Sequence, residues 1–314
     1  MTTQPPAWRF TGLHWESTHP VLTACPLPGD SGSQPGPETR RPAAPGTRIA
    51  WILTGPRACT GVWTGADRRP CPATAPVPPG TTDAQCTACA RADRGRQIAR
   101  DKAPDDGREY LLYLAWFGPG LIKIGLTAAD RGRDRLLEQG AITFTMLAVG
   151  PYAAIRQAEQ AASAAGLAAE RITARSKTAA WPGLPGPRER AALLAAARDR
   201  LTNQVSWPHR VKLVPDGVSD QAQDFGLTGQ VPGSWQEVTA IRDRAILAGQ
   251  IRFVVGRHVL LDTSAGPLLC DMRRAAGRVI RLVPGTGPLP APAGLGLVDS
   301  PTPGGRDDGQ QPLF

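Results

Sequence analysis

The chain has 314 residues, of which 41% are hydrophobic and 20% charged, so it can bury two or three modest cores, which excludes a peptide or a mini-protein. Its formal net charge is +9, and all but four of its 36 basic residues are arginines. The sequence contains neither a long apolar run nor the charged and apolar regions of a signal peptide, so we expect a soluble cytoplasmic protein without a membrane partner.

Residues 1–104 are rich in loops and carry short apolar runs, which predict a small β domain. Four cysteines in this region have the spacing C-x11-C-x14-C-x2-C and are Cys59, Cys71, Cys86 and Cys89. Thiolates with this spacing can complete the tetrahedron that zinc prefers, and a structural zinc would replace a core that this proline-rich segment cannot build. A redox pair at Cys86 and Cys89, or four ordinary free thiols, are the alternatives.

Residues 105–205 predict an α/β domain. Two apolar runs divided by Gly118-Pro-Gly120 are typical of a β-hairpin. A helix should then end at Gly140, because glycine is the favoured residue just after a helix. A third strand and two more helices follow, so the expected elements are strands at 110–117, 121–126 and 142–149 and helices at 128–139, 152–169 and 187–204.

Residues 206–284 return to short strands and predict a second small β domain, for which packing against the first is one arrangement. Residues 285–314 are mostly proline, glycine and polar residues, so we expect a disordered tail. The predicted class is α+β, with a central antiparallel sheet and helices flanked by small β domains.

Positive charge is concentrated in two regions. Residues 171–212 carry nine basic side chains against two acidic ones, and residues 242–281 carry eight against three. Such regional excess favours a nucleic-acid backbone or another polyanion as a partner. The alternative is a solvated surface rich in arginine.

The segments Tyr110-x-x-Tyr113 and Lys123-Ile-Gly125, followed by an arginine-bearing helix, resemble the GIY-YIG nuclease superfamily. The resemblance implies a metal-dependent phosphodiester hydrolase, an endonuclease, that uses Mg²⁺ or Mn²⁺. The catalytic residues that it implies are Tyr110 or Tyr113 as the first tyrosine, Lys123 in the second triplet, Arg133 with Arg135 as its alternative, and Glu159 as the metal ligand. Lys123 stands where the best catalysts have a tyrosine, and a lysine cation cannot accept the proton of water.

Further polar residues around this region are expected to contact nucleic acid. Lys177 would contact a phosphate, and Gln139 would hydrogen-bond a base or the backbone, although it can equally be an ordinary polar neighbour of a helix end. The expected contact residues are Arg131, Gln139, Arg171, Arg175 and Lys177.

A second resemblance covers nearly the whole chain. The segments Arg9-Phe-Thr-Gly-Leu13, Cys59-Thr-Gly-Val-Trp63, Gln85-Cys-x-x-Cys89 and Lys177-x-x-x-Trp181 are similar to the uncharacterised bacterial family called domain of unknown function 2797. This resemblance implies that the cysteines and the Lys-Ile-Gly segment belong to one architecture, but it supplies no activity.

Two functions therefore remain open. The first is a zinc-stabilised protein that binds nucleic acid through a GIY-YIG-like domain and hydrolyses it. The second is a catalytically inactive structural or interaction module that binds nucleic acid or an acidic protein. The dependence of affinity on salt concentration distinguishes phosphate binding from the other cases.

Overall fold

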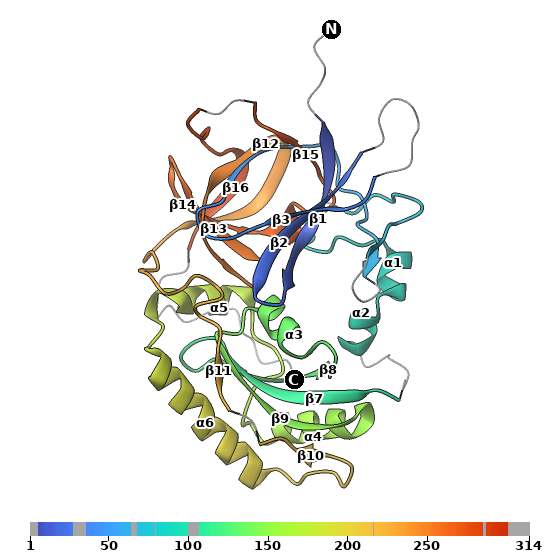
Figure 1. The fold of residues 1–314 in the computed structure, drawn as a ribbon, viewed down its shortest axis with the longest axis vertical. Coiled ribbons are helices and arrows are strands. Elements are labelled where there is room, and N and C mark those ends of the chain that lie inside the picture. The colour runs from blue at the N-terminus through green and yellow to red at the C-terminus, as the bar shows by residue number, and fades with distance from the viewer. Residues whose placement is uncertain are drawn as a thin grey trace. The chain divides into compact units, whose positions relative to one another are not determined.

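The computed structural model describes residues 6–27, 36–63, 68–78, 80–99, 107–215, 217–284 and 287–300. The chain forms two compact units: unit 1 combines residues 1–104 with 235–299, and unit 2 combines 105–234 with 300–314. Within the described residues the fold is α+β, with three mainly antiparallel sheets and six α-helices, in agreement with the predicted class (Figure 1). No helix in this described part is long and apolar enough to span a membrane.

Unit 1 is built on one nine-stranded sheet. Its strands are β1 (Ala7–Glu16), β2 (His19–Pro26), β3 (Thr39–Pro42), β4 (Arg48–Thr54), β12 (Gln236–Val255), β13 (His258–Thr263), β14 (Gly266–Asp271), β15 (Val279–Leu282) and β16 (Ala293–Asp299). The order along the sheet is β13-β14-β12-β4-β15-β1-β2-β3, and β16 pairs with β12. Alternation along β4 points Ile49, Trp51 and Leu53 into the core, as expected for a strand with one buried face.

This sheet changes the predicted division of the chain. The sequence suggested separate β domains at 1–104 and 206–284, whereas β4 pairs with both β12 and β15 in a single sheet. Residues 206–234 belong to unit 2, where β10 (Lys212–Leu213) and β11 (Ser219–Asp220) pair with β9 (Thr143–Pro151). Pairing between strands so distant in sequence leaves no signal in local hydrophobic patterns.

The predicted disordered tail at 285–314 is also corrected in part. Residues 293–299 form β16, which pairs with β12 through backbone hydrogen bonds that need few apolar side chains. Glycine allows the close approach, because a Cβ on Gly294 would lie 3.0 Å from Ala245 Cα, and one on Gly296 would lie 3.0 Å from Ala240 Cβ. Residues 301–314 lie outside the described residues.

Unit 1 also carries a small module beside the sheet. It contains the two-stranded pair β5 (Val62–Trp63) and β6 (Arg68–Arg69) and the short helices α1 (Thr87–Ala92) and α2 (Arg94–Ala99). A short 3-10 helix, η2 (Met272–Arg274), follows β14 in the sheet part of the unit. The module is poor in regular structure, as its proline and glycine content predicts.

Unit 2 contains the predicted hairpin at its centre. β7 (Glu109–Trp116) pairs with β8 (Ile122–Ala128) on one side and with β9 on the other. The helices are α3 (Gly132–Gln139), α4 (Tyr152–Ala164), α5 (Ala174–Ala180) and α6 (Pro187–Gln204), and a 3-10 turn, η1 (Trp181–Gly183), follows α5. Gly140 ends α3 in the left-handed conformation with φ of 71°, as the sequence predicted.

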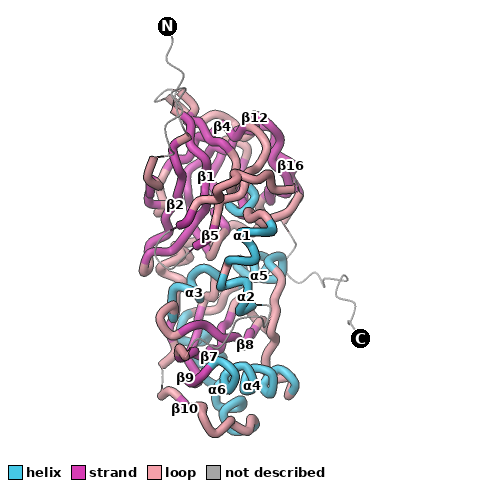
Figure 2. Tube along the Cα trace, turned by 90° about the vertical axis from the view of Figure 1, so that its right-hand side faces the viewer, coloured by secondary structure: helices cyan, strands magenta, loops and turns pink. Residues whose placement is uncertain are grey.

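Helices cover both faces of this sheet. Figures 1 and 2 show α3 on one side and α4 and α6 on the other. Tyr113 packs with Leu136 of α3 in one core cluster, whereas Tyr110 on the opposite face meets Tyr152 of α4 with ring centroids 5.2 Å apart. β7 is therefore a central strand buried on both faces.

Candidate functional site

The four predicted cysteines converge in unit 1. Cys59 lies before β5, Cys71 follows β6, Cys86 precedes α1 and Cys89 lies within it. Their sulfur atoms all lie within 4.8 Å of one another. Cys59, Cys71 and Cys89 are buried and Cys86 is half-buried. The cluster therefore unites residues that are up to 30 positions apart in the sequence.

Backbone amides surround these sulfur atoms. The amides of Cys86 and Gly61 donate to Cys59 Sγ over 3.2 and 3.4 Å. Burial raises the pKa of the Cys59 and Cys89 thiols. Burial alone would also raise that of Cys71, but amide hydrogen bonds within the turn that follows it lower the pKa to about 7. Amide donors aimed at sulfur stabilise thiolates, which is the form that binds metal ions.

The surroundings of the cysteines fit a structural zinc ion. A tetrahedral ion with Zn–S bonds of about 2.3 Å separates its sulfur ligands by about 3.8 Å, close to the 4.0 Å between Cys71 Sγ and Cys86 Sγ. Apart from the cysteines, the buried cluster at this place contains Val62 and Val77. So few apolar side chains cannot stabilise the module alone, and the four cysteines could hold a zinc ion that does so.

Two arginines attach this module to the sheet of unit 1. The guanidinium of Arg57 donates to the carbonyl oxygens of Asp83 at 2.8 Å, Ala276 at 2.9 Å and Arg273 at 3.0 Å. Arg68 Nε donates to Glu38 Oε1 over 2.7 Å in a pair whose side chains are 5% and 13% exposed. The module is therefore held on the sheet by buried polar contacts whose donors are satisfied.

The second group of polar residues lies in unit 2, on the face of the sheet that α3 covers. Tyr113 Oη accepts hydrogen bonds from Gln139 Nε2 at 2.8 Å and Lys123 Nζ at 3.3 Å. Lys177 Nζ donates to the carbonyl oxygen of Gln139 at 3.0 Å and lies 3.6 Å from the centre of the Phe117 ring. One lysine ammonium group is thus held by Tyr113 and the other by Gln139.

Gly125 makes room for this arrangement. Tyr113 stands directly opposite Gly125 in the β7–β8 pair. A Cβ at position 125 would lie 2.4 Å from Tyr113 Oη and 2.8 Å from Lys123 Nζ. The glycine of the Lys-Ile-Gly segment is therefore explained by close approach of the phenol.

Two arginines follow, along the chain, a segment that pairs with β8 at Lys123. Ala169 pairs with β8 at Lys123, and its carbonyl oxygen accepts from the amide of Ile124 at 3.0 Å. This pairing brings the segment that continues through Arg171 to Arg175 of α5 to the β8 edge of the sheet. Both arginines are exposed, and among the described residues neither has an ion-pair partner.

The remaining predicted residues contact other side chains or are buried. Arg133 forms an ion pair with Asp224 and donates from Nε to Gln221 Oε1 at 3.3 Å. The other two arginines of α3 contact one carboxylate, since Glu138 lies 2.6 Å from Arg131 and 3.6 Å from Arg135. Tyr110 is fully buried beside α4 and Tyr113 is 1% exposed.

Glu159, the predicted metal ligand, is buried on α4 and forms an ion pair with Arg156. Burial raises the pKa of its carboxyl group above the usual value, against the lowering effects of Arg156 and of the Lys123 charge. Among the described residues, the four cysteines are the group of three or more potential ligands close enough to share an ion. The structure therefore brings Tyr113, Lys123, Gln139 and Lys177 together, and gives Arg133 and Glu159 other contacts.

The sequence analysis did not predict α5 or the ion pair between the buried Arg190 and Asp220. The signal for α5 was present, because Thr173 is its N-cap and accepts from the amide of Ser176 at 3.0 Å. Arg190 makes a two-pronged contact with Asp220, with Nε at 2.8 Å and Nη2 at 2.9 Å from the two carboxylate oxygens. Nothing in local sequence distinguishes this buried arginine from its exposed neighbours on α6.

Comparison with known proteins identifies the family of the chain. No curated protein and no solved structure matches the chain. Residues 81–280 match the family described as protein of unknown function (DUF2797), a stretch that includes Cys86 and Cys89 and the whole of the Lys123 group. This match extends over more than half of the sequence, and the chain therefore belongs to the DUF2797 family.

Proposed function

We propose that the protein binds the phosphate backbone of nucleic acid through a cationic surface of unit 2, defined by Lys123, Arg171, Arg175 and Lys177. The observation that carries the proposal is the placement of the two ammonium groups on Tyr113 and Gln139. Lysine and arginine side chains presented together attract phosphates and release their counterions.

The distribution of the other cations supports this choice. Of the nine basic side chains between residues 171 and 212, Arg190 is buried against Asp220, and Arg198 donates to Thr145 Oγ1 at 3.4 Å and to the carbonyl oxygen of Val214. These two serve the fold. Arg171 and Arg175 are instead exposed, and they follow Ala169, which pairs with Lys123 at the β8 edge. Arginine binds phosphate oxygens through a planar fork of donors, which suits this role.

We do not propose that the protein hydrolyses nucleic acid. The predicted endonuclease mechanism needs an arginine that reaches the phosphate and a carboxylate that holds Mg²⁺ or Mn²⁺. Arg133 contacts Asp224, and Glu159 contacts Arg156, so both would have to exchange partners before acting. The GIY-YIG interpretation of residues 105–205 stays a prediction.

We further propose that Cys59, Cys71, Cys86 and Cys89 hold a structural zinc ion. Zinc would supply the cross-link that orders the module, and it would take no part in nucleic-acid binding. The buried sulfur atoms, their amide donors and the small apolar cluster around them support this assignment.

The binding proposal is tested by fluorescence anisotropy with labelled duplex and single-stranded DNA and RNA of about 20 nucleotides. We expect Lys123→Ala and the double variant Arg171→Ala/Arg175→Ala to weaken binding of all sequences alike. Each lost phosphate contact should reduce the slope of log affinity against log salt by about 1.

Lys212→Ala is the matched control. Lys212 is an exposed lysine on β10, at the edge of the same sheet opposite β8, and it carries the same charge. We expect the affinity of the Lys212→Ala protein for the labelled nucleic acids to remain close to that of the unchanged protein. Equal losses in Lys212→Ala and Lys123→Ala would show attraction by net charge alone and would contradict the proposed surface.

A further inference from the structure

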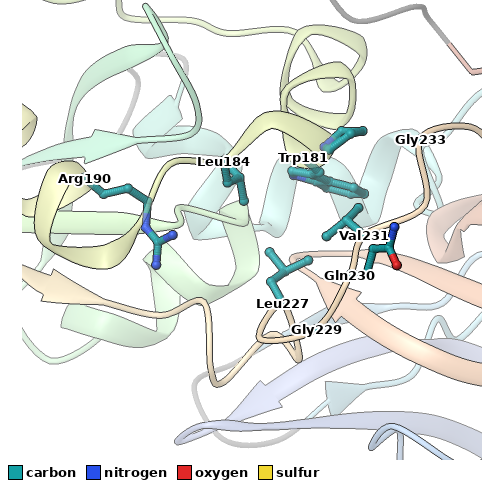
Figure 3. Close-up of a pocket in the computed structure, with 9 residues that line it drawn as sticks. Trp181, Leu184, Arg190, Leu227, Gly229, Gln230, Val231 and Gly233 are labelled. Carbon is teal, nitrogen blue, oxygen red and sulfur yellow. The ribbon is translucent and has the colours of Figure 1, made fainter.

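A pocket of about 440 Å³ opens on unit 2 directly after α5. Figure 3 shows Trp181 and Leu184 on one side of it and Leu227 and Val231 on the other. Arg190 contributes a charged wall and Gln230 an amide. A concave site of a few hundred Å³ that combines apolar side chains with polar groups can hold a small ligand, and the exposed lining of this pocket is more polar than apolar.

Arg190, which lines this pocket, uses only three of its five N–H groups in hydrogen bonds within the described residues. The residue is 7% exposed, and the three hydrogen bonds of its guanidinium go to the two oxygens of Asp220 and to the carbonyl oxygen of Pro185. An arginine has five N–H groups. Within the described residues, one N–H on Nη1 and one on Nη2 therefore remain for a ligand. Asp220 neutralises the charge of Arg190, so the pocket favours a neutral ligand with two acceptors over an anion.

From these groups we infer that the pocket takes a guanine base from an unpaired stretch of nucleic acid. Guanine presents the adjacent acceptors O6 and N7, which arginine binds with two N–H groups. Its flat ring would pack against Leu227 and the small exposed part of Trp181.

The place of the pocket connects it to the cationic surface, and in this respect the inference rests on the proposed function. Trp181 follows α5 without a break, one helical turn after Lys177, which is a rise of about 6 Å. The turn between β7 and β8 fixes this end of α5, because a Cβ on Gly118 would lie 2.4 Å from Ala180 Cβ. A strand whose phosphates contact Lys177 therefore passes the mouth of the pocket, where one of its bases can enter.

The experiment compares single-stranded oligothymidylates that carry one central guanine, 7-deazaguanine or adenine, at equal length and salt. We expect the full-length protein to bind the guanine strand about tenfold more tightly than the other two, because 7-deazaguanine lacks the N7 acceptor and adenine lacks O6. Affinities within twofold for all three strands, with phosphate binding intact, would overturn the inference and leave the proposed function standing.

Two variants and a free nucleotide complete the test. Arg190→Lys keeps a cation for Asp220 but loses the fork, whereas Val231→Trp fills the pocket from a half-exposed loop position and leaves the ion pair untouched. Both should abolish the guanine preference and retain the salt dependence. If no oligonucleotide binds, titration of the unchanged protein with guanosine monophosphate, followed by calorimetry, still decides the inference. Saturable binding that Val231→Trp removes would support the guanine pocket, and absence of binding would overturn it.

Discussion

The hydroxyl group of Tyr113 and the side-chain amide of Gln139 lie 2.8 Å apart, in the part of unit 2 where β7 meets the end of α3. This contact joins the hairpin to the helix that follows it. Lys123 donates to the same hydroxyl, and Lys177 donates to the backbone carbonyl of Gln139. Two cations from segments about 50 residues apart are therefore positioned by one tyrosine and one glutamine.

Substitution of Gly125 tests how closely Tyr113 and Lys123 pack against this position. We expect Gly125→Ala to lower the free energy of unfolding by about 1 to 3 kcal/mol, because the added methyl group would overlap Tyr113 Oη and Lys123 Nζ. Denaturant unfolding followed by circular dichroism measures the change. Gly183→Ala is the control, since a Cβ at position 183 meets nothing within 4 Å. Equal stability of the two variants would mean that the phenol does not occupy this space.

The cysteine cluster gives a prediction about metal content. Purified protein should contain about one zinc ion per chain, and Cys59→Ser should lose it together with part of the thermal stability, because metal binding and folding of the module are coupled. Elemental analysis and a thermal melt measure the two effects. Cys25→Ser should keep the ion, since Cys25 lies outside the cluster. Less than about half an equivalent of zinc in the unchanged protein would remove the assignment.

A pH dependence is expected at Asp271. Burial alone would raise the pKa of this carboxyl group, but hydrogen bonds and charge from Arg273 lower it below its usual value. The folded state therefore binds fewer protons than the unfolded state, so the stabilisation is complete above the unfolded pKa of about 3.9 and is lost as the pH falls below it. Asp271→Asn should cost about 2 kcal/mol at pH 7.

The difference between the two proteins should shrink as the pH is lowered from 5 toward 2, which urea unfolding at each pH measures. Asp262→Asn removes an exposed pair with Arg252 and should change stability by less than about 1 kcal/mol throughout. If the difference in free energy of unfolding between Asp271→Asn and the unchanged protein stays constant with pH, the charge of the Asp271 carboxylate contributes nothing to stability.

The local elements of unit 2 could be predicted from the sequence. The hairpin at 110–126, the cap at Gly140 and the helix at 187–204 follow from apolar periodicity and from glycine and proline positions. α5 was missed, because its seven residues, three alanines and four polar residues, show no apolar stripe, although Thr173 marks its start. Short helices of this kind are recognised by their caps rather than by periodicity.

The pairings between distant segments could not be predicted. The union of β4 with β12 in one sheet depends on contacts about 200 residues apart. The same limit applies to the sites. The spacing of the cysteines predicted their convergence, because a C-x2-C pair must present both sulfurs at one turn. The partners of Arg133 and Arg190 come from residues 220–224, and no spacing rule connects these segments.

The most direct test of the binding account is the salt dependence of affinity for a labelled DNA duplex between 50 and 300 mM potassium chloride. Four phosphate contacts, from Lys123, Arg171, Arg175 and Lys177, predict a linear plot of log affinity against log salt with a slope of about −3 to −4. The Arg171→Ala/Arg175→Ala protein should give a slope of about −2. A slope near zero for the unchanged protein, or the same slope for both proteins, would contradict the cationic surface proposed for unit 2.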